Sequence, residues 1–569
     1  MVGVKFDEKT KLWSHIGELE CWDSNVNFGQ MLLDTLSDHG SKTAQINHDT
    51  GAKMSFNELK WKTICAAQSL RERGFQYKDV FSFMAVNSEN LCPIVFAALC
   101  MGCPINPLHC TLSKDEIAKI LKKTKTKAIF CDIDSYNLID EALKESKSNY
   151  SGLSNVQIFT FDGQTLNSEP VDSLFIHRAN EHEFTPVHVD LSNDIAGIFS
   201  SSGTTGPSKC VSLPYIMIYA HICQIMLKDD ICLSFEPFYW TVWLYYVMTC
   251  TVKGSTRIIS QKNFSAALQL EIIEKYKVTA LGTTPAYMTT SLKTDDICTK
   301  DLSSVRLIMV FGGKLYSGMV IEMQKCYPKS KMTAVYGLTE LGTIFEYILD
   351  KNGNYLPVGL YNGVTMKIVD DNGNRCGPKI DGEICTKKKY EFIEYLNDPN
   401  TTAASFDSEG FFLTGDIGHF DENGTLHIID RKKDVFNIFY FEAPFRPSEM
   451  ESYLITLPDI QEICVVGIST SIDEELPAAV IVRNSNSSLS KRHFYELVTH
   501  NFPTRMWLRG GVYFVDSLPK TPSGKIIRGK VTELATEIFH KAGINDPDIQ
   551  SYIADIPEDV RKLITRNTE

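Results

Sequence analysis

The sequence has no hydrophobic segment long enough to cross a membrane. Its longest apolar runs, Leu91–Ile105 and Pro237–Val252, fall short of the roughly 18–20 residues that a membrane-spanning helix needs, so each is expected to form a buried helix. The first twenty residues contain no continuous apolar stretch. No secretory signal is therefore expected, and the 16 cysteines are interpreted as reduced intracellular thiols. A Ser-Lys-Leu peroxisomal address is also missing from Arg566–Glu569, which favours the cytoplasm.

An excess of positive charge is missing as well. The chain carries 57 Lys and Arg against 70 Asp and Glu, a net charge of −13. Nucleic acid is not an expected partner, because phosphate-backbone binding needs a basic face; a local basic pocket for a small anion stays compatible with this balance. With 43% hydrophobic and 22% charged residues, the composition is that of a globular protein. The 569 residues suffice for about two to four structural units, which favours an enzyme.

The P-loop of many nucleotide-binding proteins is absent too. Neither Ile198–Lys209 nor Pro519–Lys525 has its spacing of Gly, four residues and Gly-Lys-Ser/Thr. The first segment, Ile-Phe-Ser-Ser-Ser-Gly-Thr-Thr-Gly-Pro-Ser-Lys, is nevertheless rich in hydroxyl groups. Its glycines free the backbone, and Lys209 adds a positive charge, a combination suited to a polyphosphate. On composition alone, a polar surface loop is an equal alternative.

Strand-like and helix-like segments alternate up to about residue 430. The expected strands are Ala128–Cys131, Val278–Gly282 and Val305–Phe311, and the expected helices are Asp115–Leu121, Ala266–Tyr276 and Tyr316–Tyr327. This alternation predicts an α/β architecture, with parallel sheets covered by helices. Turn residues at 371–374 and 421–424 predict two hairpins. The charged run Asp430–Asp434 is interpreted as a linker, which divides the chain into residues 1–430 and 431–569.

Five motifs occur in the order found in one family of enzymes. They are Ile198–Lys209, Tyr336–Glu340, Thr414–Asp416, Asp430–Lys433 and Pro519–Lys525. Together they resemble the adenylate-forming superfamily, which includes acyl-CoA synthetases, beetle luciferases and the adenylation domains of peptide synthetases. The insect luciferase-like and fatty acyl-CoA synthetase branch is the most similar in style. The resemblance implies a large amino-terminal multi-sheet α/β domain that binds AMP, followed by a smaller, mobile α+β lid domain.

The resemblance also implies a binding site for ATP. The residues implied to hold its β- and γ-phosphates are Ser202, Gly203, Thr204, Thr205, Gly206 and Lys209. Those implied to bind the adenine are Gly312, Gly313, Tyr336 and Gly337, and those implied to bind the ribose are Asp416 and Arg431. Isolated from the other motifs, Asp416 would be interpreted as a turn residue; the ordered set favours the binding role.

Three residues are implied to be catalytic. In the implied reaction, a carboxylate attacks the α-phosphate of ATP. Negative charge then gathers on the phosphorus oxygens, where cations stabilise it. By resemblance, Thr339 contacts the α-phosphate, Glu340 helps to hold Mg²⁺, and Lys525 bridges the acyl carboxylate and the α-phosphate. Lys433 occupies the implied hinge position, about which the lid rotates after adenylation. A charged linker residue without such a role is an equal alternative for Lys433.

Two segments depart from the family pattern. By resemblance, Trp240 and His221 are substrate-binding residues, but Pro237–Trp243 carries tryptophans where relatives often have histidine and glycines. Either these indoles reshape the acyl pocket or they belong to the core. In Asn437–Pro444, the glycine of an element that serves thioester formation is missing, which puts the coenzyme A step in doubt while leaving adenylation intact.

The sequence thus predicts an ATP- and Mg²⁺-dependent acid-thiol ligase. It activates a carboxylic acid, with a fatty acid favoured, through an acyl-adenylate to acyl-CoA, and coenzyme A is the second substrate. One alternative is a luciferase-like monooxygenase that acts on its own adenylate. Another is a catalytically impaired relative that binds acyl groups or nucleotides. By resemblance, the peroxisome is an alternative to the cytoplasm as the location of the protein. The sequence gives no oligomeric state.

Overall fold

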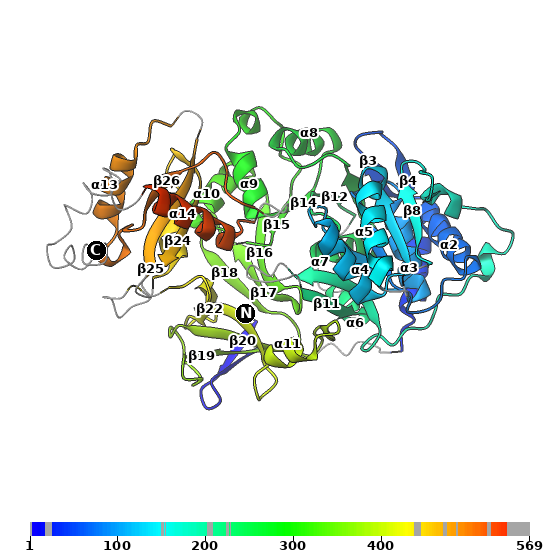
Figure 1. The fold of residues 1–569 in the computed structure, drawn as a ribbon, viewed down its shortest axis with the longest axis horizontal. Helices are drawn as coiled ribbons and strands as arrows, with labels where there is room; N and C mark the ends of the chain where they lie inside the picture. Colours follow the sequence, from blue (N-terminus) through cyan, green and yellow to red (C-terminus); the bar gives the residue numbers. More distant parts are fainter. Residues whose placement is uncertain are drawn as a thin grey trace.

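The computed structural model has a large amino-terminal part and a small carboxy-terminal part (Figure 1). It describes residues 3–16, 25–149, 153, 155–201, 209–222, 227, 229–313, 315–436, 438, 445–469, 475–484, 487–520 and 525–542. Within these residues the chain forms sheets of nine, eight, six and three strands. None of the helices in this portion is both long and apolar enough to span a bilayer.

The nine-stranded sheet has the order β18-β17-β16-β15-β14-β12-β13-β3-β4. Its strands are β3 (Thr43–Asn47), β4 (Lys53–Ser55), β12 (Ile231–Ser234), β13 (Thr256–Ile259), β14 (Ala280–Thr283), β15 (Leu307–Val310), β16 (Lys331–Leu338), β17 (Gly342–Leu349) and β18 (Tyr355–Leu360). The strands from β3 to β16 pair in parallel, whereas β4, β17 and β18 pair antiparallel at the two edges. Its connecting helices are α7 (Thr241–Val252), α8 (Ala266–Tyr276), α9 (Pro285–Leu292) and α10 (Ser317–Cys326). This sheet confirms the predicted α/β architecture.

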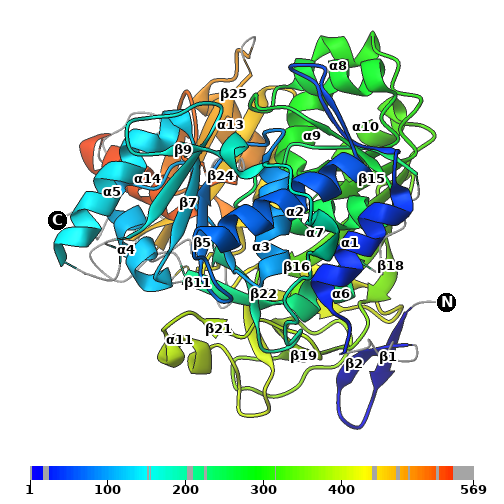
Figure 2. The same cartoon turned by 90° about the vertical axis from the view of Figure 1, so that its right-hand side faces the viewer.

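The eight-stranded sheet has the order β21-β11-β10-β6-β5-β7-β8-β9. Its strands are β5 (Phe81–Met84), β6 (Ile105–Pro107), β7 (Ala128–Asp132), β8 (Gln157–Phe161), β9 (Glu169–Pro170), β10 (Ile195–Ser201), β11 (Lys209–Pro214) and β21 (Glu394–Tyr395). The nearby helices are α1 (Phe28–His39), α2 (Phe56–Glu72), α3 (Leu91–Met101), α4 (Lys114–Thr124), α5 (Tyr136–Asn149) and α6 (Tyr215–Ile222). Figure 2 shows α4 and α5 on one face of this sheet and α2 and α3 on the other. Every residue of α3 is buried, as expected for the apolar run that contains it.

The local sequence explains why α4 begins and ends where it does. The Ser113 hydroxyl accepts a hydrogen bond from the Glu116 N–H, and the Glu116 carboxylate accepts one from the Ser113 N–H at 2.8 Å. This reciprocal capping satisfies N–H groups that have no partner within the helix. Buried Ile117, Ile120 and Leu121 lie at helical spacing and pack against the sheet. The helix ends at Lys125, whose backbone is left-handed (φ +53°).

The six-stranded sheet is antiparallel throughout, in the order β1-β2-β19-β20-β22-β23. Its strands are β1 (Val4–Asp7), β2 (Leu12–His15), β19 (Val364–Val369), β20 (Gly382–Lys388), β22 (Phe412–Phe420) and β23 (Leu426–Arg431), with the short α11 (Pro399–Ala404) beside it. The strand–helix alternation predicted as far as residue 430 therefore stops near β17. Here strands are joined by turns such as 421–424, as the turn residues indicated, and a turn joins antiparallel neighbours without a crossover helix.

The small part of the chain has its own sheet and core. Strands β24 (Ile460–Ser469) and β25 (Glu475–Arg483) pair antiparallel, and β26 (Gly511–Phe514) joins β25 in parallel. Its helices are α12 (Pro447–Leu454), α13 (Lys491–Asn501) and α14 (Arg528–Ala542). Buried side chains such as Met450, Ile481 and Phe494 form a hydrophobic cluster separate from that of the large part. This is the α+β unit that the sequence predicts, although Asp430 and Arg431 lie in β23 and not in a linker.

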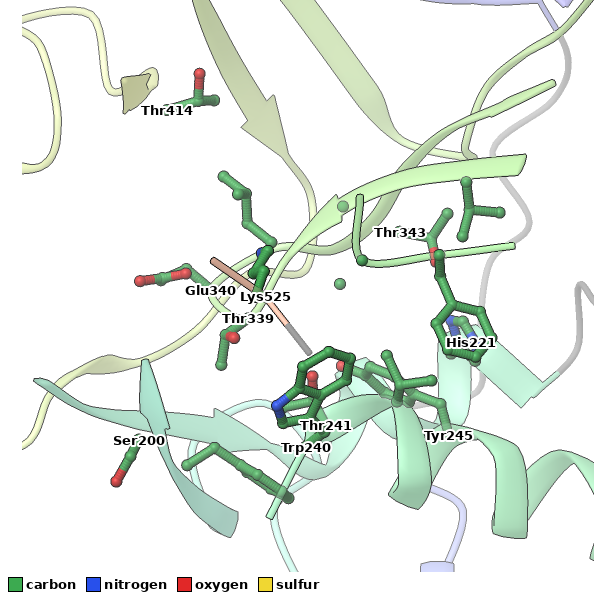
Figure 3. Close-up of a pocket in the computed structure, with 18 of the residues that line it drawn as sticks. Ser200, His221, Trp240, Thr241, Tyr245, Thr339, Glu340, Thr343, Thr414 and Lys525 are labelled. Atoms are coloured by element: carbon green, nitrogen blue, oxygen red, sulfur yellow. The ribbon is translucent and has the colours of Figure 1, made fainter. Parts of the chain in front are cut away.

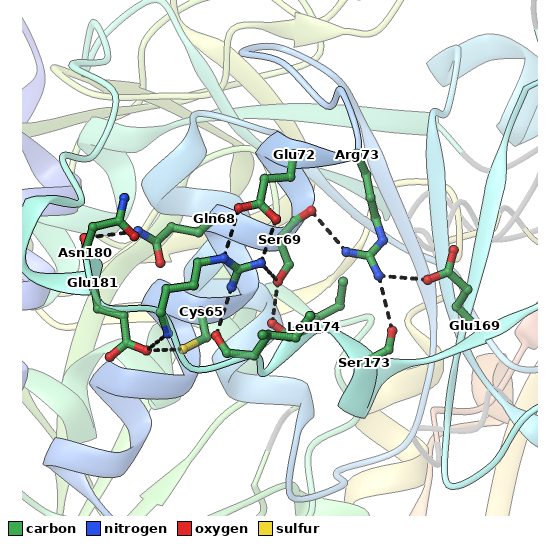
Figure 4. A network of polar contacts seen from close by, with 12 residues as sticks. Cys65, Gln68, Ser69, Glu72, Arg73, Glu169, Ser173, Leu174, Asn180 and Glu181 are labelled. Atoms are coloured by element: carbon green, nitrogen blue, oxygen red, sulfur yellow. Dashed lines mark hydrogen bonds and ion pairs between the residues drawn. The ribbon is translucent and has the colours of Figure 1, made fainter.

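A polar network fastens the segment after β9 to helix α2 (Figure 4). The Arg178 guanidinium donates to both carboxylate oxygens of Glu72, at 2.9 and 2.7 Å, and to the Ser69 hydroxyl at 2.9 Å. Arg73, which directly follows Glu72, donates to Glu169 of β9 at 2.8 Å. Paired guanidinium–carboxylate bonds fix both distance and direction, so this segment is held along α2.

Candidate active site

A cavity of about 850 Å³ lies where the two parts of the chain meet. Its wall comes from the β16–β17 hairpin, from α7, from β22 and β23, and from residues of the small part. Basic side chains gather in it, although the chain as a whole is acidic. They are Lys209, Arg431, Lys433, Lys525 and Arg528. The cavity is therefore a local basic pocket, which the net negative charge of the chain did not exclude.

The tip of the β16–β17 hairpin carries Thr339 and Glu340 into this cavity. The Tyr395 hydroxyl donates to Glu340 Oε1 at 2.8 Å, and the Phe392 N–H donates to the Glu340 carbonyl at 2.9 Å. Lys388 Nζ donates to the carbonyls of Leu341 and Thr343, at 2.6 and 2.9 Å. The segment from Lys388 to Tyr395 thus holds the tip on both sides.

Tyr395 also contacts Lys209, the last residue of the predicted phosphate loop. Lys209 Nζ lies 4.5 Å from the centre of the Tyr395 ring, within the range of a cation–π contact. One aromatic side chain therefore touches both the lysine implied to bind phosphate and the carboxylate implied to bind Mg²⁺. The remaining phosphate-loop residues of the prediction lie outside the described residues. They are Ser202, Gly203, Thr204, Thr205 and Gly206.

Asp416 is the centre of a buried charge cluster. Strands β22 and β23 place Asp416 directly opposite Arg431, and Arg431 Nε lies 2.8 Å from Asp416 Oδ1. The Tyr336 hydroxyl donates to Asp416 Oδ2 at 2.6 Å, and the Thr414 hydroxyl accepts from the Asp416 N–H at 3.1 Å. Asp416 is only 3% exposed, and this burial raises the pKa of its carboxyl against the opposing effect of Arg431. Three motifs distant in sequence, those of Tyr336, Asp416 and Arg431, therefore meet at one point.

Lys525 brings the small part of the chain to the same place. The loop before α14 carries it to the cavity, beside the charges of Arg431, Asp416 and Lys433. Removal from water and the positive charge of Arg431 lower the pKa of Lys525, while Asp416 opposes the shift. Figure 3 draws Lys525 close to Thr339 and Glu340. The catalytic residues implied by the resemblance thus line one cavity.

The predicted residues divide into those on the cavity wall and those behind it. On the wall are Lys209, His221, Trp240, Gly312, Gly337, Thr339, Glu340, Arg431, Lys433 and Lys525. Tyr336 and Asp416 lie behind Arg431, to which Asp416 is bonded, and Gly313 packs against Pro285. Arg431 therefore faces the cavity, and the buried Asp416 contacts it from inside the protein.

The two tryptophans of the atypical aromatic segment have different environments. Trp243 is 3% exposed, packs edge-on against Phe238 and donates its indole N–H to Asn87, so it belongs to the core. Trp240 lines the cavity instead and lies over the backbone of Gly312. A Cβ at Gly312 would stand 3.3 Å from the Trp240 ring, and the backbone there is left-handed (φ +82°), so glycine permits this contact.

His221 lies apart from Lys525 in Figure 3, on the side of the cavity that also carries Tyr245 and Thr343. Its ring stacks on Tyr245, with centroids 4.2 Å apart, and burial together with the charge of Lys388 lowers the pKa of His221 to about 3. The imidazole is therefore neutral at physiological pH. His221 contributes a polar but uncharged surface to this end of the cavity.

Several residues of the site carry no signal in the sequence. Tyr395, Lys388 and Arg528 lie in segments that match none of the quoted motifs, and they reach the site only through tertiary packing. Arg528 binds Glu451 with two hydrogen bonds, at 2.8 and 3.0 Å, and lies 3.5 Å from Asp434, which follows the predicted hinge. The thioester segment Asn437–Pro444 lies outside the described residues except for Ile438.

Comparison with known families agrees with this geometry. A model of the AMP-binding enzymes matches residues 33–396, and a model of the AMP-binding enzyme C-terminal domain matches residues 449–525. The chain therefore belongs to the AMP-binding enzymes of the adenylate-forming superfamily, and it is an adenylate-forming enzyme that resembles acyl-CoA ligases.

Individual relatives are distant but extend along most of the chain. "4-Coumarate--CoA ligase 2" of Petroselinum crispum is 28% identical over 520 residues, covering 87% of this chain and 92% of its own length. ATP-bound MatB from Rhodopseudomonas palustris has a similar fold, with a TM-score of 0.80, 22% identity, and coverage of 90% of this chain and 100% of its own. The anthranilate CoA ligase AuaEII, solved with anthranoyl-AMP, gives a TM-score of 0.78 at 19% identity, covering 91% and 99%. These names favour neither a fatty acid nor the luciferase-like alternative.

Proposed function

We propose that the protein is an ATP- and Mg²⁺-dependent carboxylic acid–CoA ligase. In the first step the acid's carboxylate attacks the α-phosphate of ATP and pyrophosphate leaves; in the second the thiol of coenzyme A displaces AMP from the acyl-adenylate. The observation that carries the proposal is the meeting of Lys209, Thr339, Glu340, Arg431 and Lys525 in a single cavity. The three cations and the Thr339 hydroxyl suit the negative charge that develops in phosphoryl transfer, and the Glu340 carboxylate suits a magnesium ion.

The residues present fit one magnesium ion. Glu340 Oε1 accepts from Tyr395, which leaves the second carboxylate oxygen for a ligand. The described residues contain no group of three or more His, Cys, Asp or Glu side chains able to hold a metal by themselves. A single carboxylate suits Mg²⁺, which proteins commonly hold through one or two carboxylates together with phosphate oxygens and water. When bound, the ion neutralises charge on the phosphates, and Tyr395 keeps Glu340 oriented toward it.

The cations divide the chemical work between them. Lys209, at the start of β11, is placed to bind the outgoing pyrophosphate. Lys525, which the small part supplies, is placed to bridge the acid's carboxylate and the α-phosphate, where charge concentrates in the transition state. Arg431, oriented by Asp416, binds the ribose. Trp240, which lies over the backbone of Gly312, lines the part of the cavity that receives the acid.

The proposal includes a domain rotation between the two steps. Residues 1–430 form the adenylation domain and residues 431–569 the lid, with Lys433 as the hinge. The charge of Lys525 occupies the cavity in the arrangement described above, which is the one that adenylation requires. Rotation about Lys433 would withdraw Lys525 and admit coenzyme A. A cytoplasmic location and the absence of a nucleic-acid partner belong to the same proposal.

The acid is proposed to be compact rather than a long fatty acid. The cavity wall includes several aromatic and hydroxyl-bearing side chains, among them His221, Tyr245 and Tyr361. Two relatives are named for aromatic acids, 4-coumarate and anthranilate, which supports this assignment.

Pyrophosphate release with a panel of acids tests the proposal. Release that depends on an acid, ATP and Mg²⁺, followed by acyl-CoA formation when coenzyme A is added, is the expected result. Glu340→Gln should raise the Mg²⁺ concentration needed for half-maximal activity, whereas Glu322→Gln, an exposed glutamate on α10, should not. Failure of every aromatic, aliphatic and dicarboxylic acid to give pyrophosphate would support the impaired binding relative instead.

A further inference from the structure

A lysine of the large part of the chain reaches across to the small part. Lys293 directly follows α9, and its Nζ donates to the carbonyls of Ile460 and Gln461, at 3.0 and 3.3 Å. These carbonyls lie at the start of β24, and Figure 1 shows the small part next to α9 and α10. Removal from water lowers the pKa of Lys293, while the negative charge of Glu462 opposes the shift. The ammonium group therefore lies in the contact between the two parts.

Helix α9 fixes this lysine relative to the cavity. Pro285, its first residue, packs against Gly313, which is next to Gly312 on the cavity wall. Lys293 follows its last residue, and eight residues of α-helix form a stiff rod about 12 Å long. The place at which Lys293 holds the small part is therefore set by the same helix that packs beside the cavity.

The strand that Lys293 binds is connected to the loop that carries Lys525. Glu462, which is the next residue of β24, forms an ion pair with Lys520 at the base of that loop. Lys520 in turn forms an isolated β-bridge with Ile526, the residue after Lys525. A shift of the start of β24 away from Lys293 would therefore also move Lys525 relative to the cavity.

An ion pair makes a second contact across the same boundary. Arg446, which directly precedes α12, lies with its guanidinium 2.7 Å from Asp381 Oδ2. The other carboxylate oxygen of Asp381 lies 2.7 Å from Nδ1 of His419, a residue of β22. His419 thus orients the carboxylate within the large part while Asp381 binds the small part. Lys293 and Asp381 therefore hold the small part from two different elements of the large part.

We propose that Lys293 and Asp381 are positioning residues for adenylation, which hold the small part in the arrangement that places Lys525 in the cavity. This inference rests on the proposed ligase function, because that function requires a different arrangement of the small part for each half-reaction. Neither residue lines the cavity, and neither belongs to a motif of the sequence analysis. They act on the reaction by setting the fraction of molecules in which Lys525 is in place.

Separate measurement of the two half-reactions tests the assignment. ATP–pyrophosphate exchange, with an acid that the unaltered enzyme activates, reports adenylation; single turnover of preformed acyl-adenylate with coenzyme A reports thioester formation. Lys293→Met should slow pyrophosphate exchange about threefold, and Lys293→Met with Asp381→Asn about tenfold, because each lost bond to a charged group favours other arrangements. Thioester formation should be no slower than in the unaltered enzyme. Lys293→Arg should keep pyrophosphate exchange within about twofold, since a guanidinium can donate to the same two carbonyls.

Amide hydrogen–deuterium exchange tests the contact itself without turnover. In Lys293→Met, the amides at the start of β24 should exchange about threefold faster or more, because this segment loses its partner on the large part. Lys300→Met is the matched control. Lys300 lies 2.9 Å from Glu274, and both belong to the large part, so its loss should change neither half-reaction nor the deuterium exchange of β24.

Three results would overturn the assignment. They are an unchanged rate of pyrophosphate exchange in Lys293→Met, an equal slowing of both half-reactions, as a general structural defect gives, and unchanged deuterium exchange at β24. Acid-dependent pyrophosphate release that is equal in Lys293→Met and the unaltered protein refutes this inference and leaves the ligase proposal standing. Failure of every acid to give pyrophosphate refutes the ligase proposal and with it the role in adenylation, even where deuterium exchange at β24 shows the contact.

Discussion

Replacing Glu236 with glutamine should make the protein more stable above neutral pH. Glu236 directly precedes the atypical aromatic segment, is 1% exposed, and neither of its carboxylate oxygens has a hydrogen-bond partner among the described residues. Burial raises the pKa of Glu236 from 4.5 to about 8. The folded protein therefore holds a proton on this carboxyl at pH values where the unfolded chain has already released it.

The direction of the pH effect follows from this difference. The contribution of Glu236 to the free energy of unfolding is most favourable below about pH 4.5. It falls as the pH rises from there toward 8 and levels off above 8, because the unfolded state binds fewer protons than the folded state in that interval. At 1.36 kcal/mol per pKa unit, the contribution of Glu236 between pH 4.5 and 7 is a loss of about 3 kcal/mol. That is a large share of the roughly 5–15 kcal/mol that stabilises a typical domain.

Urea unfolding at pH 5, 6, 7 and 8 measures this contribution directly. Glu236→Gln cannot ionise, so its free energy of unfolding should fall less with pH than that of the unaltered protein, and the gap should widen by about 1 kcal/mol per pH unit. Glu322→Gln, on the exposed surface of α10, should change stability by less than about 0.5 kcal/mol at every pH. Parallel pH profiles for Glu236→Gln and the unaltered protein would show that Glu236 does not hold a proton in the folded state.

Three further predictions concern the two half-reactions. Asp416→Ala should weaken ATP binding roughly 10- to 100-fold in calorimetry, because Arg431 loses its orienting carboxylate; an unchanged affinity would make Asp416 a turn residue only. Lys388→Met should lower the rate of pyrophosphate release about tenfold with little change in ATP affinity, because the hairpin tip with Thr339 and Glu340 loses two hydrogen bonds from one charged group; a rate equal to that of the unaltered protein would contradict this. Single-turnover reaction of a preformed acyl-adenylate with coenzyme A should be slow relative to adenylation, because residues 437–444 lack the family's glycine; rapid conversion would refute that reasoning.

The charged half of the site was predictable because short motifs and local pairing determine it. Asp416 and Arg431 are fifteen positions apart, and the turn residues at 421–424 indicate a hairpin between them. Regular pairing outward from that turn would place Asp416 opposite Asp430, but a register shift between Ile417 and Gly418 places it opposite Arg431. The hairpin that brings these two motifs together is therefore a consequence of local sequence, whereas the exact pairing depends on the register shift in β22.

The acid-binding half depends on packing that the sequence does not reveal. Trp240 and Trp243 belong to the same short aromatic segment, and only their tertiary neighbours place one on the cavity and the other in the core. Tyr395 and Lys388 reach the hairpin tip from two other sheets, so no spacing within the sequence indicates them. The expected fatty acid came from the resemblance alone, and the aromatic and hydroxyl-bearing side chains of the wall that argue against it become visible only when the cavity is formed.

The most direct test of the account compares Lys525→Ala with Lys530→Ala. Lys525 lines the cavity, whereas Lys530 is an exposed residue of α14 in the same part of the chain. Because Lys525 is assigned to charge that develops in the transition state, its loss should slow ATP–pyrophosphate exchange by roughly 100-fold or more while ATP affinity stays within about threefold. Lys530→Ala should change neither quantity. Exchange at the unaltered rate in Lys525→Ala, with an acid that the unaltered enzyme activates, would contradict the account.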